Sequence, residues 1–557
     1  MEKIWLKSYG KGVPANVEFE EINLSEALAR SAGRFPNNAA LLFEGTSVTF
    51  KQLDDMVSRF ANGLKSLGVK PGDKVGVLLP NIVQIVVAIY GTFRAGAIAV
   101  MNNPLYTDRE LEHQFNDSGC TVLVSLDVLL PRMIKLREKT KVAKLISCHI
   151  RDYLPFPKKQ LFPFVRKQMH LKTPQTPEVY EFTDLVKNYT PISDPPRPTM
   201  EETAVLLYTG GTTGVSKGVE LTHANLSYNC QQCRVWFPGF DDGKERVVGC
   251  LPFFHSFGLT TAMNMGIFAG WGIILIPNPR DPASMLKAIS TYKPSYMPAV
   301  PTLYNALINF PELKKYDISS IRGCFSGGAP LPMETIKTFE HLTGAQICEG
   351  YGLTESTPVT HINPYGGQTK LGTIGLPIPN TDAKLVDVDN YDNEITAPGQ
   401  PGEICLKGPQ IMKGYINRPE ETAATLKDGW LLTGDIGVFD EDGYFSVVDR
   451  KKDMIISGGF NIYPRDVDEL LFTHPKILEA CVIGVPDERS GERIKAYVVL
   501  KEGQTATSEE IIDFCKQNLV HYKVPKFVEF VKDLPKSPVG KILRKELRRM
   551  DQEKTGK

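Results

Sequence analysis

The chain has 557 residues, of which 42% are hydrophobic and 23% charged, the balance of a globular protein with several domain-sized units. Its 64 basic residues equal its 64 acidic ones, so overall charge does not favour nucleic acid or an anionic membrane. An anionic ligand would have to be held by local groups.

The cysteines and the hydrophobic stretches indicate a reduced, soluble protein. The ten cysteines are scattered, and Cys230 and Cys233 form one C-x-x-C without a second pair, which favours packing over a metal or redox site. Residues 1–24 lack the apolar run of a signal peptide. The most hydrophobic window, residues 75–101, contains Pro80 and Arg94 and predicts a buried strand, helix and strand. We therefore expect a cytoplasmic location.

The N-terminal third alternates short β-rich runs with helical ones. Residues 24–67 have helical apolar spacing around a hairpin at 40–43 and 47–50, and further strands and helices alternate from residue 74 onward. This alternation predicts doubly wound α/β layers with mainly parallel strands.

Residues 152–173 break that pattern with prolines, basic residues and aromatic residues. Such a segment could contact an anionic bilayer as a peripheral protein does. The favoured interpretation is a solvated loop whose aromatic side chains cover the core.

A glycine-rich run follows the strand expected at 205–208. Glycines let backbone N–H groups turn toward an anion, while hydroxyls and one lysine add donors, which together predict a loop that holds a polyphosphate. It is not a Walker A loop, and the alternative is a flexible linker. The residues concerned are Thr209, Gly210, Gly211, Thr212, Thr213, Gly214, Ser216, Lys217 and Gly218.

The chain beyond this loop falls into three stretches. A helix is expected from Glu220 to Arg234, followed by further α/β units as far as residue 326. From about residue 365 to 451 short strands with frequent glycines predict a small barrel-like antiparallel subdomain. Five consecutive charges at 449–453 then precede an α+β module with helices at 464–474 and 508–519, strands at 479–485, 495–500 and 527–530, and a basic terminal helix. We place a domain boundary at Lys452, between domains 1–451 and 452–557.

Several residues outside the glycine loop are candidates for chemistry. Tyr351 offers an aromatic face, and Glu355 a carboxylate that could meet phosphates through Mg²⁺ or simply favour a helix N-terminus. Asp435, expected in a turn after a strand, could accept two ribose hydroxyls or merely form the turn. Taken alone, Lys541 at a helix start would be a solvated lysine, and His255 a hydrogen-bonded histidine at a buried strand end.

Eight motifs together carry a resemblance to a known family. They run from YTGGTTGVSKG (208–218) through LPFFHSFGL, SGGAPLP, EGYGLTE, GEICLKGPQIMKGY, GWLLTGD and DRKKDMIISGGFNIYP to PKSPVGKILRKEL (535–547). In this order they resemble the adenylate-forming superfamily of acyl-CoA synthetases, luciferases and adenylation domains, and most of all bacterial long-chain fatty-acid–CoA ligases. Ser216, where many relatives have proline, is a departure that leaves the hydroxyl and lysine chemistry in place.

The resemblance implies a two-step ligase with ATP, Mg²⁺ and coenzyme A. A fatty acid attacks the α-phosphate of ATP to give acyl-adenylate and pyrophosphate, and the thiol of CoA then displaces AMP. By this likeness the loop from Thr209 to Lys217 holds the outer phosphates, and Thr209 and Glu355 bind Mg²⁺. The remaining implied nucleotide contacts are Gly328, Ala329, Gly350, Tyr351 and Gly352 around adenine, Thr354 at the α-phosphate, and Asp435 and Arg450 at the ribose.

The resemblance also implies a mobile C-terminal domain. Lys452 would be its pivot, Lys541 would bridge the fatty carboxylate and the α-phosphate, and Gly458 and Gly459 would line the pantetheine channel. His255 would stand between the acyl tunnel and the reaction centre. A homodimer is a further expectation.

Three alternatives stay open from the sequence. The acid could be aryl, medium-chain or an amino acid, and the acceptor could be a carrier-protein thiol in place of CoA. A catalytically silent lipid- or nucleotide-binding homologue is the non-enzymatic alternative. A nucleic-acid partner is not expected.

Overall fold

The structure is a computed structural model that describes residues 3–209, 216–457, 460–487, 489–536 and 542–555. The chain forms two compact units. The larger comprises Trp5–Asp382 and Lys407–Leu431, and the smaller comprises Met1–Ile4, Ala383–Leu406 and Leu432–Lys557. The predicted boundary at Lys452 falls inside the smaller unit and stays a prediction. In the described part of the chain, no helix has the length and apolar character needed to cross a membrane.

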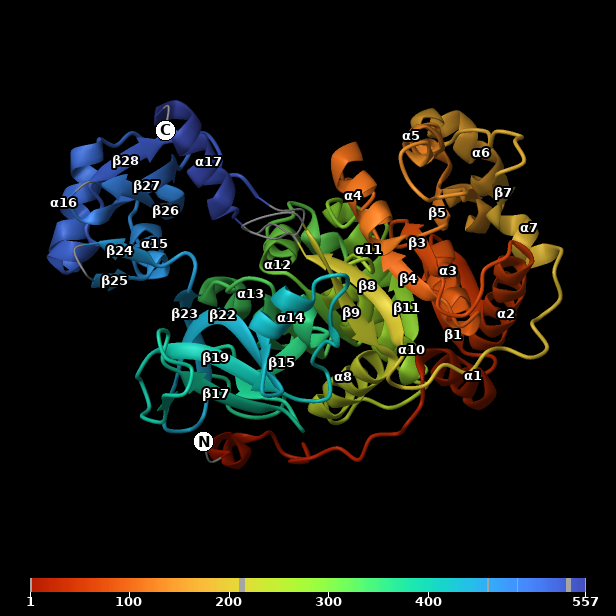
Figure 1. Cartoon of the computed structure of the whole chain (residues 1–557), viewed down its shortest axis with the longest axis horizontal. Helices are drawn as coiled ribbons and strands as arrows, with labels where there is room; N and C mark the ends of the chain where they lie inside the picture. The colour runs from red at the N-terminus through yellow and green to blue at the C-terminus, as the bar shows by residue number, and fades with distance from the viewer. Residues whose placement is uncertain (1–2, 210–215, 458–459, 488, 537–541, 556–557) are drawn as a thin grey trace. The chain divides into compact units, whose positions relative to one another are not determined.

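The larger unit contains two mixed sheets (Figure 1). The nine-stranded sheet has the order β16 (Leu376–Pro377), β15 (Val359–Ile362), β14 (Gln346–Gly352), β13 (Gly323–Ser326), β12 (Tyr296–Ala299), β10 (Arg246–Gly249), β11 (Gly272–Leu275), β1 (Ala39–Phe43), β2 (Thr46–Thr49). The eight-stranded sheet has the order β20 (Gly414–Tyr415), β9 (Lys217–Thr222), β8 (Thr203–Thr209), β4 (Ile98–Met101), β3 (Lys74–Leu78), β5 (Val122–Leu126), β6 (Lys144–Cys148), β7 (Val179–Glu181).

The strands from β8 to β7 are mutually parallel, as are those from β14 to β1, so the expectation of mainly parallel α/β layers is confirmed. The hairpin of β1 and β2 is confirmed as well. The helices of this unit include α1 (Leu24–Arg34), α2 (Phe50–Ser66), α3 (Val83–Arg94), α4 (Asp108–Ser118), α5 (Leu130–Arg137), α6 (Lys158–Val165), α7 (Phe182–Lys187), α8 (His223–Trp236), α11 (Pro282–Tyr292), α12 (Pro301–Ile308), α13 (Met333–Thr343) and α14 (Pro419–Thr425).

A helical layer joins the two sheets. Helix α3 contacts β3 and β4 of the eight-stranded sheet, whereas α2 contacts β1 and β2 of the nine-stranded sheet, and the two helices pack on each other. Every residue of α3 is buried, which explains why its sequence is apolar all round rather than on one face. The predicted buried strand, helix and strand at 75–101 are therefore β3, α3 and β4.

The smaller unit also has two sheets. In one, β18 (Glu394–Ile395), β17 (Asp382–Val386), β19 (Gly402–Lys407), β22 (Trp430–Phe439) and β23 (Phe445–Arg450) are neighbours in that order. The other has β25 (Phe460–Ile462), β24 (Ile455–Ser457), β27 (Gly491–Leu500) and β26 (Ile477–Asp487), with β28 (Phe527–Phe530) beside β27. A sixth strand, β21 (Leu426–Lys427), also pairs with β22. The predicted β-rich stretch is thus a six-stranded sheet in which no pair joins β18 to β21 or β23 among the described residues.

The C-terminal sheet is covered on both faces. Ala480 and Val482 pack into a core with α15 (Pro464–Phe472) and α16 (Ser508–Asn518), while Cys481 and Ile483 pack with Leu547 of α17 (Arg544–Thr555). The alternation follows from the two-residue period of a strand. The helices and strands predicted in this module are confirmed to within a few residues.

Three expectations about local structure need correction. Strand β9 continues through Thr222, and α8 begins at His223 rather than Glu220, because Thr222 and Asn225 form a capping box. Asp435 lies within β22 rather than in a turn after a strand, because β22 bends at Gly434 (φ 70°) and keeps pairing with β23.

The third correction concerns residues 152–173, whose aromatic side chains do not all cover the core. Phe156 is 82% exposed and Phe164 is 72% exposed, and α6 has no buried residue.

The ten cysteines all lie in the described part of the chain and are buried and free. Burial raises the pKa of the Cys230 and Cys233 thiols, which agrees with packing rather than redox chemistry.

Candidate functional site

Several candidate residues follow the carboxyl ends of parallel strands in the nine-stranded sheet. His255 comes after β10, Gly328 and Ala329 after β13, and Thr354 and Glu355 after β14. In the sheet order β10, β12, β13 and β14 are neighbours and parallel. Ligands of open α/β sheets bind beyond this edge, so the fold gathers these residues where a site is expected.

Asn81 fixes the segment that leads to His255, and the sequence did not single it out. It follows β3, and its side-chain amide donates to the carbonyls of Gly249 and Leu251 at 2.9 and 2.7 Å while its oxygen accepts from Phe253 N–H at 3.0 Å. Asn81 is only 3% exposed. One buried side chain therefore ties an end of the eight-stranded sheet to the loop after β10.

His255 itself is exposed and begins the short helix α9 (Ser256–Gly258). Its Nδ1 accepts a hydrogen bond from Phe257 N–H at 3.3 Å. An accepting Nδ1 requires the ring proton on Nε2, so the outer nitrogen of the neutral ring is a donor.

The glycines of this edge are explained by the backbone. Gly328 has φ 86°, a conformation that L side chains rarely adopt. A Cβ on Gly350 would lie 2.3 Å from a ring carbon of Phe325, and one on Gly352 would lie 1.9 Å from the carbonyl oxygen of Pro358. Close packing is therefore sufficient to require glycine at 350 and 352, and their contact with adenine stays a prediction.

Tyr351 and Ala329 present different surfaces. The Tyr351 ring is half-buried and lies edge-on to His361, with 5.9 Å between ring centroids. Ala329 is exposed.

Tyr415 connects two of the predicted functional groups. Its hydroxyl donates to Oε1 of Glu355 at 2.8 Å, and Nζ of Lys217 lies 4.4 Å from the centre of its ring. Strand β20 places Tyr415 beside β9, with Tyr415 opposite Val219. Burial and, after it, the Glu355 charge raise the pKa of the Tyr415 hydroxyl, so that it is a donor at neutral pH.

The predicted phosphate loop is closed by a strand pair. Thr209 ends β8 and lies opposite Lys217, the first residue of β9. Gly210, Gly211, Thr212, Thr213 and Gly214 lie outside the described residues. The structure thus places Lys217 and Glu355 against one tyrosine. Thr209 lies opposite Lys217 at the end of β8.

Lys217 has a second partner that the sequence did not reveal. Its Nζ forms an ion pair of 2.8 Å with Oε2 of Glu421 in α14. The two side chains are 28% and 42% exposed. A pair so open to solvent contributes little stability, about 1 kcal/mol or less, and can exchange for another anion.

The smaller unit brings together the two predicted ribose residues. Asp435 and Arg450 are opposite each other on β22 and β23, and Nε of Arg450 lies 3.1 Å from Oδ1 of Asp435. The Asp435 side chain is 4% exposed and that of Arg450 31% exposed. A pocket is lined by Thr433, Gly434, Asp435, Arg450, Lys451 and Lys452.

Glu403 holds two of the residues that line this pocket. Its two carboxylate oxygens accept from Gly434 N–H and from Nζ of Lys451, each at 3.0 Å. Glu403 is 4% exposed, so both of its oxygens are satisfied inside the fold. The sequence contained no signal for this role.

Lys452 lies in the exposed turn between β23 and β24. The next residue, Asp453, is buried and pairs with Nη1 of Arg548 at 2.9 Å. Its expected role as a pivot stays a prediction, and Lys541, Gly458 and Gly459 lie outside the described residues.

Sequence reasoning singled out Glu355, Lys217, Asp435 and Arg450 as candidates through their motifs, and their roles stay predictions, but it did not single out Tyr415. That tyrosine ends the GEICLKGPQIMKGY motif, so the signal was present without a role.

Comparison with known proteins gives the same assignment over nearly the whole chain. Residues 28–416 match the "AMP-binding enzyme" family, and residues 466–541 match the "AMP-binding enzyme C-terminal domain". The chain is 46% identical over 549 residues to a long-chain-fatty-acid–CoA ligase of Bacillus subtilis (strain 168), with 98% of each chain covered. It is 42% identical over 554 residues to the ligase of that name from Escherichia coli O157:H7, again with 98% of each chain covered.

Solved structures agree with these relatives. An anthranilate CoA ligase in complex with anthranoyl-AMP matches with a TM-score of 0.84 at 27% identity, over 96% of this chain and 98% of that one. The motifs, the two-unit fold and the matches across both units lead to one conclusion: the chain belongs to the AMP-binding enzyme family, whose members form acyl-adenylates.

Proposed function

We propose that the chain is an ATP-dependent fatty-acid–CoA ligase for long-chain acids. The observation that carries this proposal is the 46% identity to the Bacillus subtilis ligase over 98% of both chains. In the first step a carboxylate oxygen bonds to the α-phosphorus, and the bond from that phosphorus to the bridging oxygen of pyrophosphate breaks. In the second step the CoA thiol loses its proton, its sulfur bonds to the acyl carbon, and AMP leaves.

Both steps join anions, so the enzyme needs positioned cations and donors more than a covalent nucleophile. Lys217 and the hydroxyl of Thr209 would bind the outer phosphates, with Lys217 exchanging Glu421 for the phosphate. Tyr351, Gly328 and Ala329 would contact adenine, and Thr354 would donate to the α-phosphate.

The residues present fit a magnesium ion. Mg²⁺ takes one or two protein oxygens together with phosphate and water oxygens. Among the described residues, the hydrogen bond from Tyr415 engages only Oε1 of the Glu355 carboxylate. The hydroxyl of Thr209, at the end of β8, is a further oxygen donor. Bound there, Mg²⁺ would neutralise phosphate charge.

The smaller unit would supply the ribose contacts and a mobile cation. Asp435 would accept from both ribose hydroxyls while Arg450 holds the carboxylate in place. Lys541 would reach the fatty carboxylate and the α-phosphate in one orientation, and Gly458 and Gly459 would line the path of pantetheine in another. Lys452, in an exposed turn, would change its backbone angles between the two without disturbing a core.

The reaction is tested by measuring AMP and pyrophosphate with fatty acids of graded length, with and without CoA. We expect acid-dependent pyrophosphate release and one acyl-CoA per AMP when CoA is added, with long chains preferred. ATP binding without acid-dependent AMP formation would instead support a silent nucleotide-binding homologue.

The two-orientation account makes a separate prediction. Lys541→Ala should abolish adenylate formation but still convert a supplied acyl-adenylate to thioester, whereas Lys452→Pro should do the reverse. The first loss should reach about 3–4 kcal/mol, the value of one preorganised charge-stabilising group. Equal loss of both half-reactions in both variants would contradict the account.

An aryl acid is the second candidate substrate, favoured by the likeness to the anthranilate CoA ligase. The same assay with anthranilate and benzoate separates the two. A carrier-protein thiol in place of CoA would appear as AMP formation that CoA does not accelerate.

Residues 152–173 would contact an anionic bilayer peripherally. Phe156, Phe164 and Val165 are 82%, 72% and 72% exposed, beside the exposed cations Arg166 and Lys167. Apolar groups of this kind enter the acyl boundary, and each nearby cation adds about 1 kcal/mol at an anionic surface. The segment would thus bring the enzyme to its poorly soluble substrate.

Co-sedimentation with phosphatidylglycerol vesicles tests this contact. We expect binding to fall at least several-fold in Phe156→Ser/Phe164→Ser and to be absent with phosphatidylcholine vesicles. Leu342→Ser, at an exposed leucine of α13, is the matched control and should sediment like the unchanged protein. Equal sedimentation of all three would refute the contact. A cytoplasmic location and a homodimer remain predictions, the latter measurable by light scattering.

A further inference from the structure

Two histidines and two carboxylates gather at the carboxyl edge of the eight-stranded sheet, away from the residues assigned above. Asp127 directly follows β5, His149 directly follows β6, and Glu181 ends β7. These three strands are neighbours and parallel, so their carboxyl ends lie side by side. Such strand ends are where α/β folds place ligand sites.

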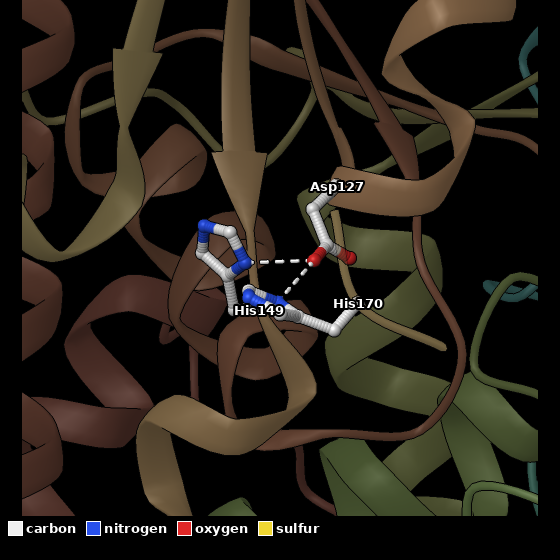
Figure 2. A group of neighbouring side chains, drawn as sticks. All are labelled: Asp127, His149 and His170. Atoms are coloured by element: carbon white, nitrogen blue, oxygen red, sulfur yellow. Dashed lines mark hydrogen bonds and ion pairs between the residues drawn. The ribbon is translucent and has the colours of Figure 1, made fainter. Parts of the chain in front are cut away.

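The side chains of Asp127, His149 and His170 converge on one point (Figure 2). Oδ2 of Asp127 lies 2.7 Å from Nδ1 of His149 and 3.0 Å from Nδ1 of His170. All three potential ligand atoms lie within 4.8 Å of one another. The side chains of Asp127, His149 and His170 are 1%, 6% and 16% exposed.

We propose that Asp127, His149 and His170 bind one divalent transition-metal ion of the zinc class. Zinc bonds of about 2.0–2.2 Å to nitrogen and oxygen place tetrahedral ligand atoms about 3.3 Å apart. The observed spacings of 2.7 and 3.0 Å would need to widen by about 0.6 and 0.3 Å, and the two histidine nitrogens, within 4.8 Å of each other, would settle at a similar separation. Two imidazoles and a carboxylate suit zinc, cobalt or nickel better than magnesium.

The surroundings of His149 are those of a metal ligand. Its Nε2 lies 3.2 Å from Oε2 of Glu181 and 3.1 Å from the hydroxyl of Thr173. Metal-bound histidines almost always give their other ring N–H to such an acceptor, which fixes the ring and leaves the first nitrogen for the metal. Thr173 is 3% exposed, so this support lies inside the fold.

Asp127 is also held by the backbone. Its Oδ1 accepts from Val128 N–H at 2.9 Å, and its Oδ2 accepts from Leu171 N–H at 2.9 Å. These bonds aim the carboxylate at the two imidazoles. They leave lone-pair capacity for a metal, since a carboxylate has about four acceptor positions.

A third carboxylate lies near His149. Asp152 lies within electrostatic range of His149 and adds a third carboxylate to those of Asp127 and Glu181. Its Oδ2 is buried and has no hydrogen-bond partner within the described part of the chain. The charges of His149 and Lys159 both act on Asp152.

The site is separate from the proposed phosphate loop. In the sheet order β5 is three strands from β8, which is about 14 Å at roughly 4.8 Å per strand. Its ligands precede and follow residues 150–169, the stretch that contains α6. A bound metal would therefore fasten both ends of that exposed segment to the sheet.

Zinc binding to untagged full-length protein, without ATP or Mg²⁺, tests the proposal by equilibrium dialysis and a colorimetric zinc chelator. Co²⁺ is the spectroscopic probe, because tetrahedral Co²⁺ gives an intense visible absorption band. We expect one Zn²⁺ per chain and a tetrahedral Co²⁺ spectrum. Both should be lost in Asp127→Asn and His170→Gln.

Two further variants guard against a misfolded or non-specific result. Glu181→Gln keeps all three ligands and should weaken Zn²⁺ by about 10- to 100-fold, as changes to supporting residues do. His341→Gln, at an exposed histidine of α13, should bind Zn²⁺ like the unchanged protein. Circular dichroism checks that each variant is folded.

The proposal is overturned if the unchanged protein binds no stoichiometric Zn²⁺, or if folded His170→Gln and Asp127→Asn bind as much and as tightly as it does. In that event the cluster is a hydrogen-bonded clasp only. Because no step of the assay uses ATP, acid or CoA, its outcome does not depend on the ligase activity.

Discussion

Tyr415→Phe isolates one contact of the proposed phosphate and magnesium site. The change removes the hydroxyl that donates to Glu355 at 2.8 Å but keeps the ring 4.4 Å from Nζ of Lys217. A hydrogen bond to a charged group contributes about 1.5–3 kcal/mol. If the whole free energy of this hydrogen bond serves to orient Glu355 toward the metal, its loss lowers kcat/KM for MgATP about 10- to 100-fold, since 1.36 kcal/mol corresponds to a factor of ten.

The assay is acid-dependent pyrophosphate release at fixed ATP across a titration of Mg²⁺. We expect Tyr415→Phe to need more Mg²⁺ and to lose rate most at low Mg²⁺. Tyr497→Phe is the matched control, because the Tyr497 hydroxyl donates to Asp551 at the same 2.8 Å. It should change stability without changing the Mg²⁺ dependence. Superimposable Mg²⁺ titrations for Tyr415→Phe and the unchanged protein would refute the role assigned to this hydroxyl.

Three further predictions follow from single contacts. Asp435→Asn weakens the pairing with Arg450 and removes one acceptor for the ribose hydroxyls. The KM for ATP, measured by pyrophosphate release, should therefore rise about 10- to 100-fold. An unchanged KM would argue against ribose binding. Glu421→Gln frees Lys217 from an exposed pair, so calorimetric binding of ATP should strengthen a few-fold while stability changes by less than about 1 kcal/mol; weaker binding would contradict the exchange. Burial lowers the pKa of His223 from 6.5 to about 4, so the stability present above pH 6.5 is lost as the pH falls toward 4. His223→Gln should reduce that loss by about 3 kcal/mol in urea unfolding at pH 7 and pH 4, and identical losses would contradict it.

Periodicity was sufficient to predict the layers of this fold. Strands β3 and β5 and helix α4 lie in the stretch where alternation was expected from residue 74 onward, and α4 begins at Asp108 because Thr107 caps it with Glu110. Patterns that depend on a few neighbouring residues are visible in one sequence. The same holds for the strands and helices of the C-terminal module.

Contacts between distant segments were not predictable. Tyr415 meets Glu355 across 60 residues and Asn81 meets Phe253 across 172, and nothing local in either motif specifies its partner. Asp435 was misplaced because Gly434 reads as a turn residue, whereas the pairing of β22 with β23 carries the strand through it. Pairing energy from a neighbouring strand overrode a local preference.

The cluster around Asp127 was likewise not predictable from the sequence. Its members are spread over Asp127, His149, His170 and Glu181, with no spacing typical of a metal motif, and only the parallel order of β5, β6 and β7 brings three of them together. The same sheet edge carries Thr209 at the end of β8, opposite Lys217 on β9, and this hydroxyl and ammonium are donors for the phosphate proposed there. The edge after β5 and β6 presents imidazoles and carboxylates, that is, acceptors for a cation. Between them the ends of β3 and β4 lead into the uncharged residues Asn81 and Asn102, each engaged in buried hydrogen bonds. The two proposed sites can therefore share one edge, because Asn81 and Asn102, at the strand ends between them, are uncharged and held by buried hydrogen bonds.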